Sequence, residues 1–214
     1  MDKKRGIMFD MDNTLLKSNI NFQAMKLETA SFLKKNGVLS ESFAIEEHTT
    51  STLIQYAKEN NGISEELYES AMQIALKYEV MGMEGAGLET GALELLIALA
   101  NEYVLVIVTN NSFQAARRAL QLTGIEGYFD LIVGREQMQA MKPSPSGYLV
   151  AKQHFPHIQQ AAWISVGDSW IDGRASMDAG IAFISYGGAA ATMEEKGVRT
   201  VAHINNLMQL LDFV

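Results

Sequence analysis

Two aspartates, Asp10 and Asp12, lie one residue apart at the end of a short apolar stretch, Gly6–Phe9. Carboxylates this close repel each other, and burying either one in its ionised form is costly. A divalent cation removes the conflict, because Mg²⁺ prefers hard oxygen ligands and keeps neighbouring acids ionised. The pair therefore predicts a metal-dependent reaction centre after the first strand.

Further polar side chains follow other apolar segments of the chain. Thr109 and Asn110 end the stretch YVLVIVTN, and Asp168 ends AWISVGD, with Asp172 one helical turn later. Lys142 lies in the segment AMKPSPSGY. Because ligands of open α/β sheets bind beyond the carboxyl ends of the strands, we expect these side chains and the acidic pair to converge in one crevice.

These residue types match what phosphoryl transfer needs. A carboxylate can act as the nucleophile, while Mg²⁺, a lysine and a hydroxyl neutralise and orient the phosphate oxygens. Taken singly, an aspartate at a strand end is more often a turn or helix-cap residue. The combination of four acids, a hydroxyl and a lysine is what indicates catalysis.

Alternating strands and helices must position these residues. Segments 112–123 and 145–155 read as helices between apolar, β-branched strands. The expected strands are Gly6–Phe9, Tyr103–Asn110, Tyr128–Gly134, Ala162–Asp168, Ile181–Gly187 and Arg199–Ile204. Such alternation implies βαβ units, so we expect an α/β fold with a Rossmann-like parallel sheet.

Between the first two strands the periodicity is helical. NFQAMKLETASFLKK carries its apolar residues on one face, and Ser64 is placed to cap a further helix. The segment that follows has the composition of a hinge or an irregular loop, with Gly82, Gly85, Gly87 and Gly91. We expect a small all-helical cap domain over 16–87 with this glycine-rich return hinge, inserted into an α/β core formed by 1–15 and 88–214.

Together these motifs resemble those of the haloacid dehalogenase-like hydrolase superfamily, and the resemblance covers the whole chain. DMDNTL is similar to the family's first motif, Thr109 in VTN to its second, Lys142 in MKPSP to its third and GDSWID to its fourth. The resemblance is to phosphatases with a helical cap, such as phosphoglycolate phosphatase. It implies a Mg²⁺-dependent phosphatase that hydrolyses a small phosphorylated metabolite through an aspartyl-phosphate intermediate.

The resemblance implies a role for each catalytic residue. Asp10 is implied to be the nucleophile, and Asp12 the general acid for the leaving alcohol and then the base for the hydrolytic water. Lys142 is implied to offset charge on the nucleophile and on the phosphate. Thr109 and the backbone N–H of Asn110 are implied to bind the phosphate oxygens together with this lysine.

Mg²⁺ is the implied cofactor. Its implied ligands are the side chains of Asp10 and Asp168 and the backbone carbonyl of Asp12. Asp172 is implied to orient a metal-bound water or the lysine from outside the ligand set, and Thr14 is expected to stabilise the turn.

Two positions depart from the family pattern, and a third is open. Asn13 stands where the family often has Gly, and Asn tolerates the left-handed conformation, so the turn can survive. Lys17 replaces a residue that is frequently acidic; a cation there either alters substrate preference or points to solvent. Trp170 either lines the pocket or packs the helix that follows.

Composition excludes several classes of partner. The chain has 214 residues, no Cys and a formal net charge of −8, which disfavours nucleic acid or an anionic membrane as a partner. We find neither an apolar run long enough for a signal peptide nor a membrane span, and expect a cytoplasmic protein. We expect a monomer or a homodimer.

Two alternatives to a phosphatase stay open from the sequence. A phosphomutase needs the same motifs and a cap that places a second hydroxyl for return transfer. A non-catalytic ligand sensor is also compatible, because a fold alone does not secure activity. Residues 16–84 contain six lysines, no arginine and ten acids, a charge of −4 that does not favour a second phosphate on the cap.

Overall fold

The computed structural model describes residues 3–187 and 190–214. The chain divides into two compact units, one formed by the residues up to Ser18 together with Ala86–Val214 and the other by Asn19–Gly85. We refer to them as unit 1 and unit 2. No helix among the described residues is both long enough and apolar enough to cross a membrane.

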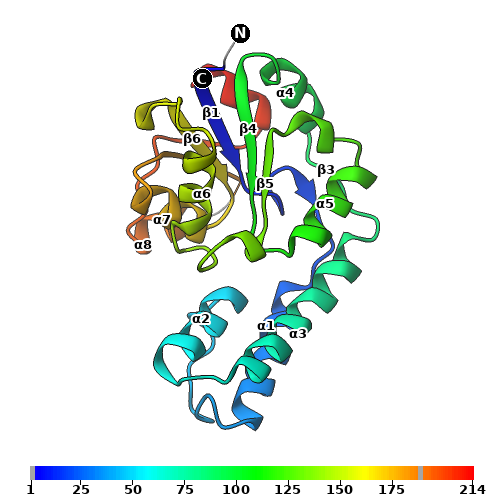
Figure 1. Cartoon of the computed structure of the whole chain (residues 1–214), viewed down its shortest axis with the longest axis vertical. Helices are drawn as coiled ribbons and strands as arrows, with labels where there is room; N and C mark the ends of the chain where they lie inside the picture. The colour runs from blue at the N-terminus through cyan, green and yellow to red at the C-terminus, as the bar shows by residue number, and fades with distance from the viewer. Residues whose placement is uncertain (1–2, 188–189) are drawn as a thin grey trace. The chain divides into compact units, whose positions relative to one another are not determined.

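Unit 1 is built on a six-stranded sheet in the order β5-β4-β1-β6-β7-β8, and every neighbouring pair is parallel. The strands are β1 (Arg5–Phe9), β4 (Tyr103–Val108), β5 (Leu131–Val133), β6 (Trp163–Gly167), β7 (Ala182–Tyr186) and β8 (Ala202–Ile204). This is the α/β, Rossmann-like parallel sheet expected from the sequence. Figure 1 shows β1 beside β4, so the first strand is central although it begins the chain.

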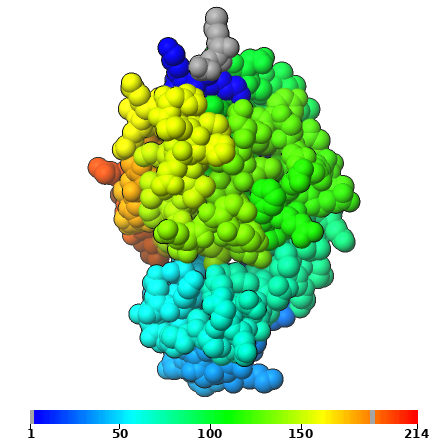
Figure 2. Space-filling model, in the orientation of Figure 1, coloured from blue at the N-terminus to red at the C-terminus, as the bar shows by residue number. Residues whose placement is uncertain are grey.

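Helices connect the strands. They are α4 (Ala92–Leu99), α5 (Phe113–Leu122), α6 (Ser146–His154), α7 (Trp170–Asp178) and α8 (Ala190–Glu195), with short 3-10 helices at Glu126–Tyr128, Arg135–Gln137, Gln160–Ala162 and Leu207–Asp212. Parallel strands need such crossovers, which lie on the faces of the sheet. In the space-filling view, atoms coloured green to yellow, which include α5 and α6, cover the strands on this face of unit 1 (Figure 2).

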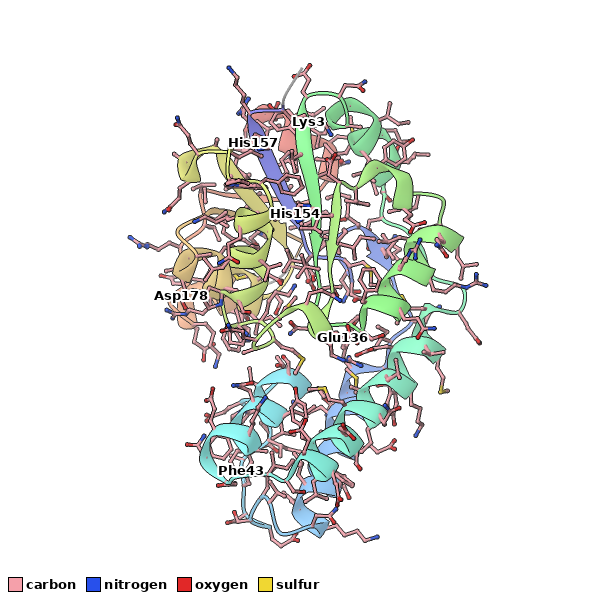
Figure 3. The ribbon with its side chains drawn as sticks, viewed as in Figure 1. Lys3, Phe43, Glu136, His154, His157 and Asp178 are labelled. Atoms are coloured by element: carbon pink, nitrogen blue, oxygen red, sulfur yellow. The ribbon has the colours of Figure 1, made fainter. Side chains whose placement is uncertain are left out.

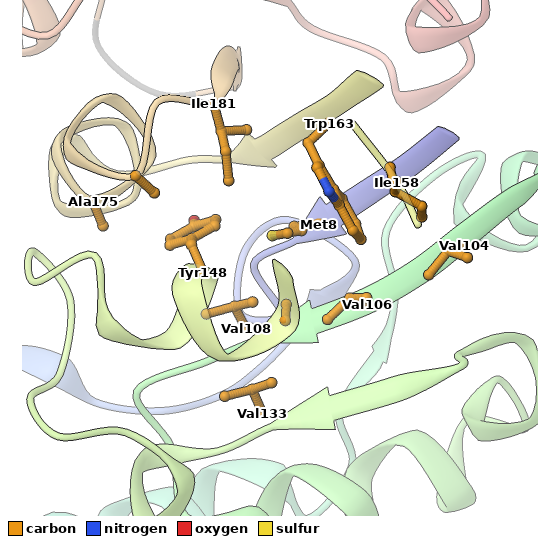
Figure 4. Packing of buried hydrophobic residues seen from close by; sticks show 12 residues of the cluster. Met8, Val104, Val106, Val108, Val133, Tyr148, Ile158, Trp163, Ala175 and Ile181 are labelled. Atoms are coloured by element: carbon orange, nitrogen blue, oxygen red, sulfur yellow. The ribbon is translucent and has the colours of Figure 1, made fainter. Parts of the chain in front are cut away.

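The core on one face of the sheet lies under α6 and α7. There Tyr148 of α6 packs beside Trp163 of β6, Met8 of β1 and Val106 of β4, all of them buried (Figure 4). Burying one such side chain contributes about 1.5–3 kcal/mol relative to leaving it in water. β4 is buried at all six of its residues, as a central parallel strand should be. This packing fixes the strand ends that carry the polar residues.

A two-stranded antiparallel ribbon, β2 (Leu16–Lys17) with β3 (Gly87–Leu88), also belongs to unit 1. The ribbon places the unit boundaries at 18/19 and 85/86, whereas the sequence predicted 15/16 and 87/88. Pairing between the two connecting segments keeps both with the sheet, and periodicity does not reveal a two-residue strand.

Unit 2 consists of three helices, α1 (Phe22–Lys35), α2 (Thr50–Asn60) and α3 (Glu65–Met83). Asn21, Thr49 and Ser64 cap their N-termini by accepting hydrogen bonds from backbone N–H groups. The buried side chains of its own core include those of Leu33, Leu53 and Ile54. Within the range expected to be helical, unit 2 therefore has its own caps and its own core.

Three features differ from the sequence-based expectations. Gly82 lies in α3 rather than in a hinge, and a Cβ there would come within 2.5 Å of the Ile20 backbone, so this glycine permits close packing. α2 lies within the range expected to be helical but was not singled out as a separate helix. α4 was not anticipated, although the buried Ala92, Leu95, Leu96 and Leu99 repeat at helical spacing. β5 has three residues rather than seven, because only these pair with β4.

Candidate active site

The turn after β1 brings the first acidic pair to the carboxyl edge of the sheet. The backbone N–H of Asp10 still donates to Val166 of β6, 2.9 Å away, so the residue continues the strand. Asn13 then adopts φ 54°, and its N–H donates to the Leu16 carbonyl at 2.7 Å. The left-handed turn expected at Asn13 is therefore present, and it reverses the direction of the chain after Asp12.

Lys142 is the central charge of the site. Its Nζ lies 2.6 Å from Oδ1 of Asp10 and 2.6 Å from Oδ1 of Asp172, and it donates to the Val108 carbonyl at 2.8 Å. The side chain is only 2% exposed. Burial alone would lower the pKa of Lys142, but the two carboxylates raise it well above its usual value. The lysine is therefore held in its charged form between two acids.

A third acid completes the cluster. Carboxylate oxygens of Asp10, Asp168 and Asp172 all lie within 4.8 Å of one another. Burial, together with the charges of Asp10 and Asp172, raises the pKa of Asp168 to about 8. Burial also raises the pKa of Asp172 to about 6, against the opposing effect of Lys142. One lysine does not balance three carboxylates, so the cluster carries excess negative charge.

This donor set fits Mg²⁺. The ion prefers hard oxygen ligands and is commonly bound by one or two carboxylates with water and phosphate completing its shell. Asp10 and Asp168 have carboxylate oxygens close enough to share a cation. Asp172 is within the same reach, but it pairs with Lys142 and also accepts the Ser169 N–H. A cation would also relieve the repulsion that raises the pKa of Asp168.

A backbone contact with the loop that precedes α7 fixes the Asp172 side chain. Its Oδ2 accepts a hydrogen bond from the Ser169 backbone N–H at 3.0 Å, a capping interaction at the start of α7. A Cβ on Gly167 would lie 2.7 Å from this carboxylate. The acid can therefore reach Lys142 only because residue 167 lacks a side chain.

The loop after β4 supplies the hydroxyl and amides. Thr109 is buried, and its Oγ1 accepts a hydrogen bond from the Asn111 N–H at 3.2 Å. The Asn110 side chain forms two hydrogen bonds with the backbone of Lys142, accepting from its N–H at 2.8 Å and donating to its carbonyl at 3.0 Å. The sequence had assigned Asn110 only a backbone role.

Thr14 and Asn111 complete the contacts around the first acidic pair. The Thr14 hydroxyl lies 3.5 Å from Oδ2 of Asp10, a long hydrogen bond that suits a role in the turn. Asn111 Nδ2 donates to Oδ2 of Asp12 at 2.7 Å. Asn111 was not among the residues that the sequence singled out. Its position next to Thr109 and Asn110 was the signal available, but its partner lies 99 residues away.

Two residues left open by the sequence have clear surroundings. Trp170 packs against the cluster of Phe183, Met193 and Val198, with Lys196 Nζ 5.5 Å from its ring centre, which favours the packing role. The Lys17 side chain is 63% exposed and lies 3.8 Å from Glu89. Glu136, which is labelled in Figure 3, lies in the 3-10 helix Arg135–Gln137 and accepts the Phe113 N–H at 2.7 Å at the start of α5.

Seven of the eight residues predicted for the site lie on the loops that follow β1, β4 and β6 or on the loop before α6, and Asp172 lies in the first turn of α7, directly after the loop that follows β6. Direct contacts join Asp10, Lys142, Asp172 and Thr14, while Asp168 lies within reach of the same carboxylates. Asp12 joins through Asn111, and Asn110 through the backbone of Lys142. Three carboxylates and a buried ammonium are thus within a few ångströms of one another.

Comparison with known proteins places this geometry in context. Residues 7–186 match the family model described as "Haloacid dehalogenase-like hydrolase". Pyrophosphatase PpaX from Listeria monocytogenes is 25% identical over 176 residues, which cover 81% of this chain and 78% of the relative.

Two solved structures share the fold. A protein from Haemophilus somnus, described as a predicted phosphoglycolate phosphatase, has a TM-score of 0.69 and 21% identity and covers 100% of this chain and 99% of its own. YfnB from Bacillus subtilis, a putative HAD-hydrolase described as bound to magnesium, has a TM-score of 0.62 and 17% identity, covering 99% of each chain. Both are similar to this chain along nearly its whole length.

Proposed function

Because the chain belongs to the haloacid dehalogenase-like hydrolase family, we propose that it is a Mg²⁺-dependent phosphatase acting on a small phosphorylated metabolite through an aspartyl-phosphate intermediate. The enzyme class, hydrolysis of phosphoric monoesters, rests on the match over residues 7–186 and on the phosphatases among its relatives. The resemblance drawn from the motifs is thereby confirmed at the level of the family.

The observation that best supports the finer proposal is the arrangement around Lys142. Its ammonium lies 2.6 Å from both Asp10 and Asp172, and Asp168 is close enough to share a cation with Asp10. Phosphoryl transfer has little covalent chemistry to catalyse beyond positioning and neutralising charge. A buried ammonium beside a nucleophilic carboxylate does both.

In the proposed first step, a carboxylate oxygen of Asp10 attacks phosphorus and the bond to the leaving oxygen breaks. Asp12 gives its proton to that oxygen, and Lys142, Thr109 and the backbone N–H of Asn110 bind the phosphoryl oxygens. In the second step, Asp12 takes a proton from water, which attacks phosphorus and releases phosphate from Asp10. Asp10, Asp168 and the Asp12 carbonyl would hold Mg²⁺, which would supply further charge neutralisation.

Phosphate release from p-nitrophenyl phosphate, with and without Mg²⁺, tests the proposal. We expect Mg²⁺-dependent turnover by the wild type and a loss of at least about a thousandfold in Asp10→Asn, since no nucleophile remains. Asp178→Asn is the matched control, because Asp178 is exposed at the end of α7. Wild-type activity in Asp10→Asn would remove Asp10 from the nucleophile role.

Neither alternative is favoured by the named relatives. If the wild type shows no turnover, the ligand-sensor hypothesis is favoured over the phosphatase. Incubation with a sugar phosphate and its bisphosphate distinguishes a phosphomutase, which isomerises its substrate without releasing phosphate. A screen of phosphorylated metabolites ranked by kcat/KM would then identify the substrate class.

A further inference from the structure

Asn111 makes a contact with the general acid that no motif required. Its Nδ2 donates to Oδ2 of Asp12 at 2.7 Å, and the two residues are 5% and 7% exposed. A buried hydrogen bond from an amide to a carboxylate is charge-assisted and fixes the rotation of the acceptor group.

The backbone of Asn111 is itself anchored on both sides. Its N–H donates to Thr109 Oγ1 at 3.2 Å, and its carbonyl accepts from the Arg135 N–H at 3.0 Å. The next residue, Ser112, caps α5 by accepting the Ala115 N–H at 3.1 Å. The side-chain amide of Asn111 therefore projects from a backbone segment that is held in place between β4 and α5.

We propose that Asn111 is a positioning residue that orients the Asp12 carboxylate for proton transfer to the leaving group. The inference rests on the proposed function, in which Asp12 is the general acid. A carbonyl-type oxygen accepts the amide N–H better than a hydroxyl oxygen does, so the contact to Oδ2 favours the acid proton on Oδ1. Asn111 thus selects the oxygen from which the proton leaves.

Leaving-group dependence provides the readout. p-Nitrophenyl phosphate releases a weakly basic phenolate that needs little protonation, whereas phenyl phosphate, of nearly the same shape, releases a more basic one. Asn111→Leu keeps the branched shape of the side chain and removes the donor. We expect it to lower kcat/KM for phenyl phosphate about tenfold more than for p-nitrophenyl phosphate, since general acid catalysis contributes far more to the former.

A double-mutant cycle tests whether Asn111 acts through Asp12. Measured in single turnover with p-nitrophenyl phosphate and phenyl phosphate, Asn111→Leu in an Asp12→Ala background is expected to change neither rate by more than about twofold, because its target is gone. Asn111→Ala serves as the second variant, and thermal unfolding establishes that each protein is folded.

The outcomes separate the inference from the proposed function. Equal losses on both substrates, or effects that multiply across the cycle, would show a general structural role and overturn the inference while leaving the phosphatase intact. If the ratio of kcat/KM for phenyl phosphate to that for p-nitrophenyl phosphate is unchanged in both Asn111 variants, the inference is likewise overturned and the phosphatase is not. A wild type that hydrolyses neither ester with Mg²⁺ present overturns the proposed function, and the inference with it.

Discussion

At the scale of single residues, the site concentrates charge that must be balanced locally. Lys142 is almost completely buried and contacts two carboxylates, so its ammonium offsets charge that water cannot reach. Burial, and then repulsion from Asp10 and Asp172, raise the pKa of Asp168. Lys142 therefore neutralises Asp10 and Asp172, and the cation that we propose would neutralise Asp168 together with Asp10.

Lys142→Met should destabilise the protein and reduce turnover. Removing the ammonium leaves Asp10 and Asp172 buried without their counter-charge, a loss of about 3–5 kcal/mol in the free energy of unfolding. Urea denaturation at neutral pH measures this change. Lys152→Met, at a partly buried lysine of α6 that contacts Gln160, is the control and should cost less. Equal destabilisation by the two substitutions would contradict a special role for the Lys142 charge.

Mg²⁺ should stabilise the folded protein through Asp168. A ligand that binds only the native state at about one hundred times its Kd adds about 2.7 kcal/mol of stability. We expect Mg²⁺ to raise the Tm of the wild type and of Asp178→Asn, but not that of Asp168→Asn. Differential scanning calorimetry without substrate measures the shift. An equal shift in Asp168→Asn would remove this residue from the ligand set.

At the scale of elements, the strand ends do most of the positioning. β1, β4 and β6 are neighbours in the sheet, so the residues that follow them emerge side by side. Lys142 comes from the loop before α6, and the Asn110 side chain ties its backbone to the end of β4. Gly167 then leaves room for Asp172 at the start of α7.

Gly167→Ala should disturb the site even though the substitution adds one methyl group. The new Cβ would lie 2.7 Å from the Asp172 carboxylate, which would have to move away from Lys142. We expect a loss of about 1–3 kcal/mol in the free energy of unfolding and a lower kcat. Gly127→Ala is the matched control, since its Cβ meets no atom within 4 Å. Similar behaviour of the two variants would show that residue 167 tolerates a side chain.

At the scale of the whole molecule, the chain separates chemistry from the inserted helices. All the proposed catalytic and metal-binding residues belong to unit 1, and none lies within Asn19–Gly85. Unit 2 has a core of its own, including Leu33, Leu53 and Ile54. Stability of the inserted helices and affinity for the cation should therefore respond to different substitutions.

Leu53→Ala is expected to loosen unit 2 selectively. Its side chain is fully buried in the helical core, so the truncation should cost about 2–5 kcal/mol locally. Hydrogen exchange should accelerate in α1, α2 and α3, while the Kd for Mg²⁺ measured by calorimetry stays within about twofold of the wild type, because no proposed ligand is altered. A large loss of Mg²⁺ affinity would contradict the separation.

The sequence by itself determined the fold class, the family and the eight residues that gather at the sheet edge. Strand-forming runs and polar residues directly after them are local features, and parallel strands necessarily place their carboxyl ends together. The tertiary structure alone decided which groups touch. The pairing of Lys142 with Asp10 spans 132 residues, and that of Asn111 with Asp12 spans 99. Such contacts depend on strand order and loop packing, which no local pattern encodes.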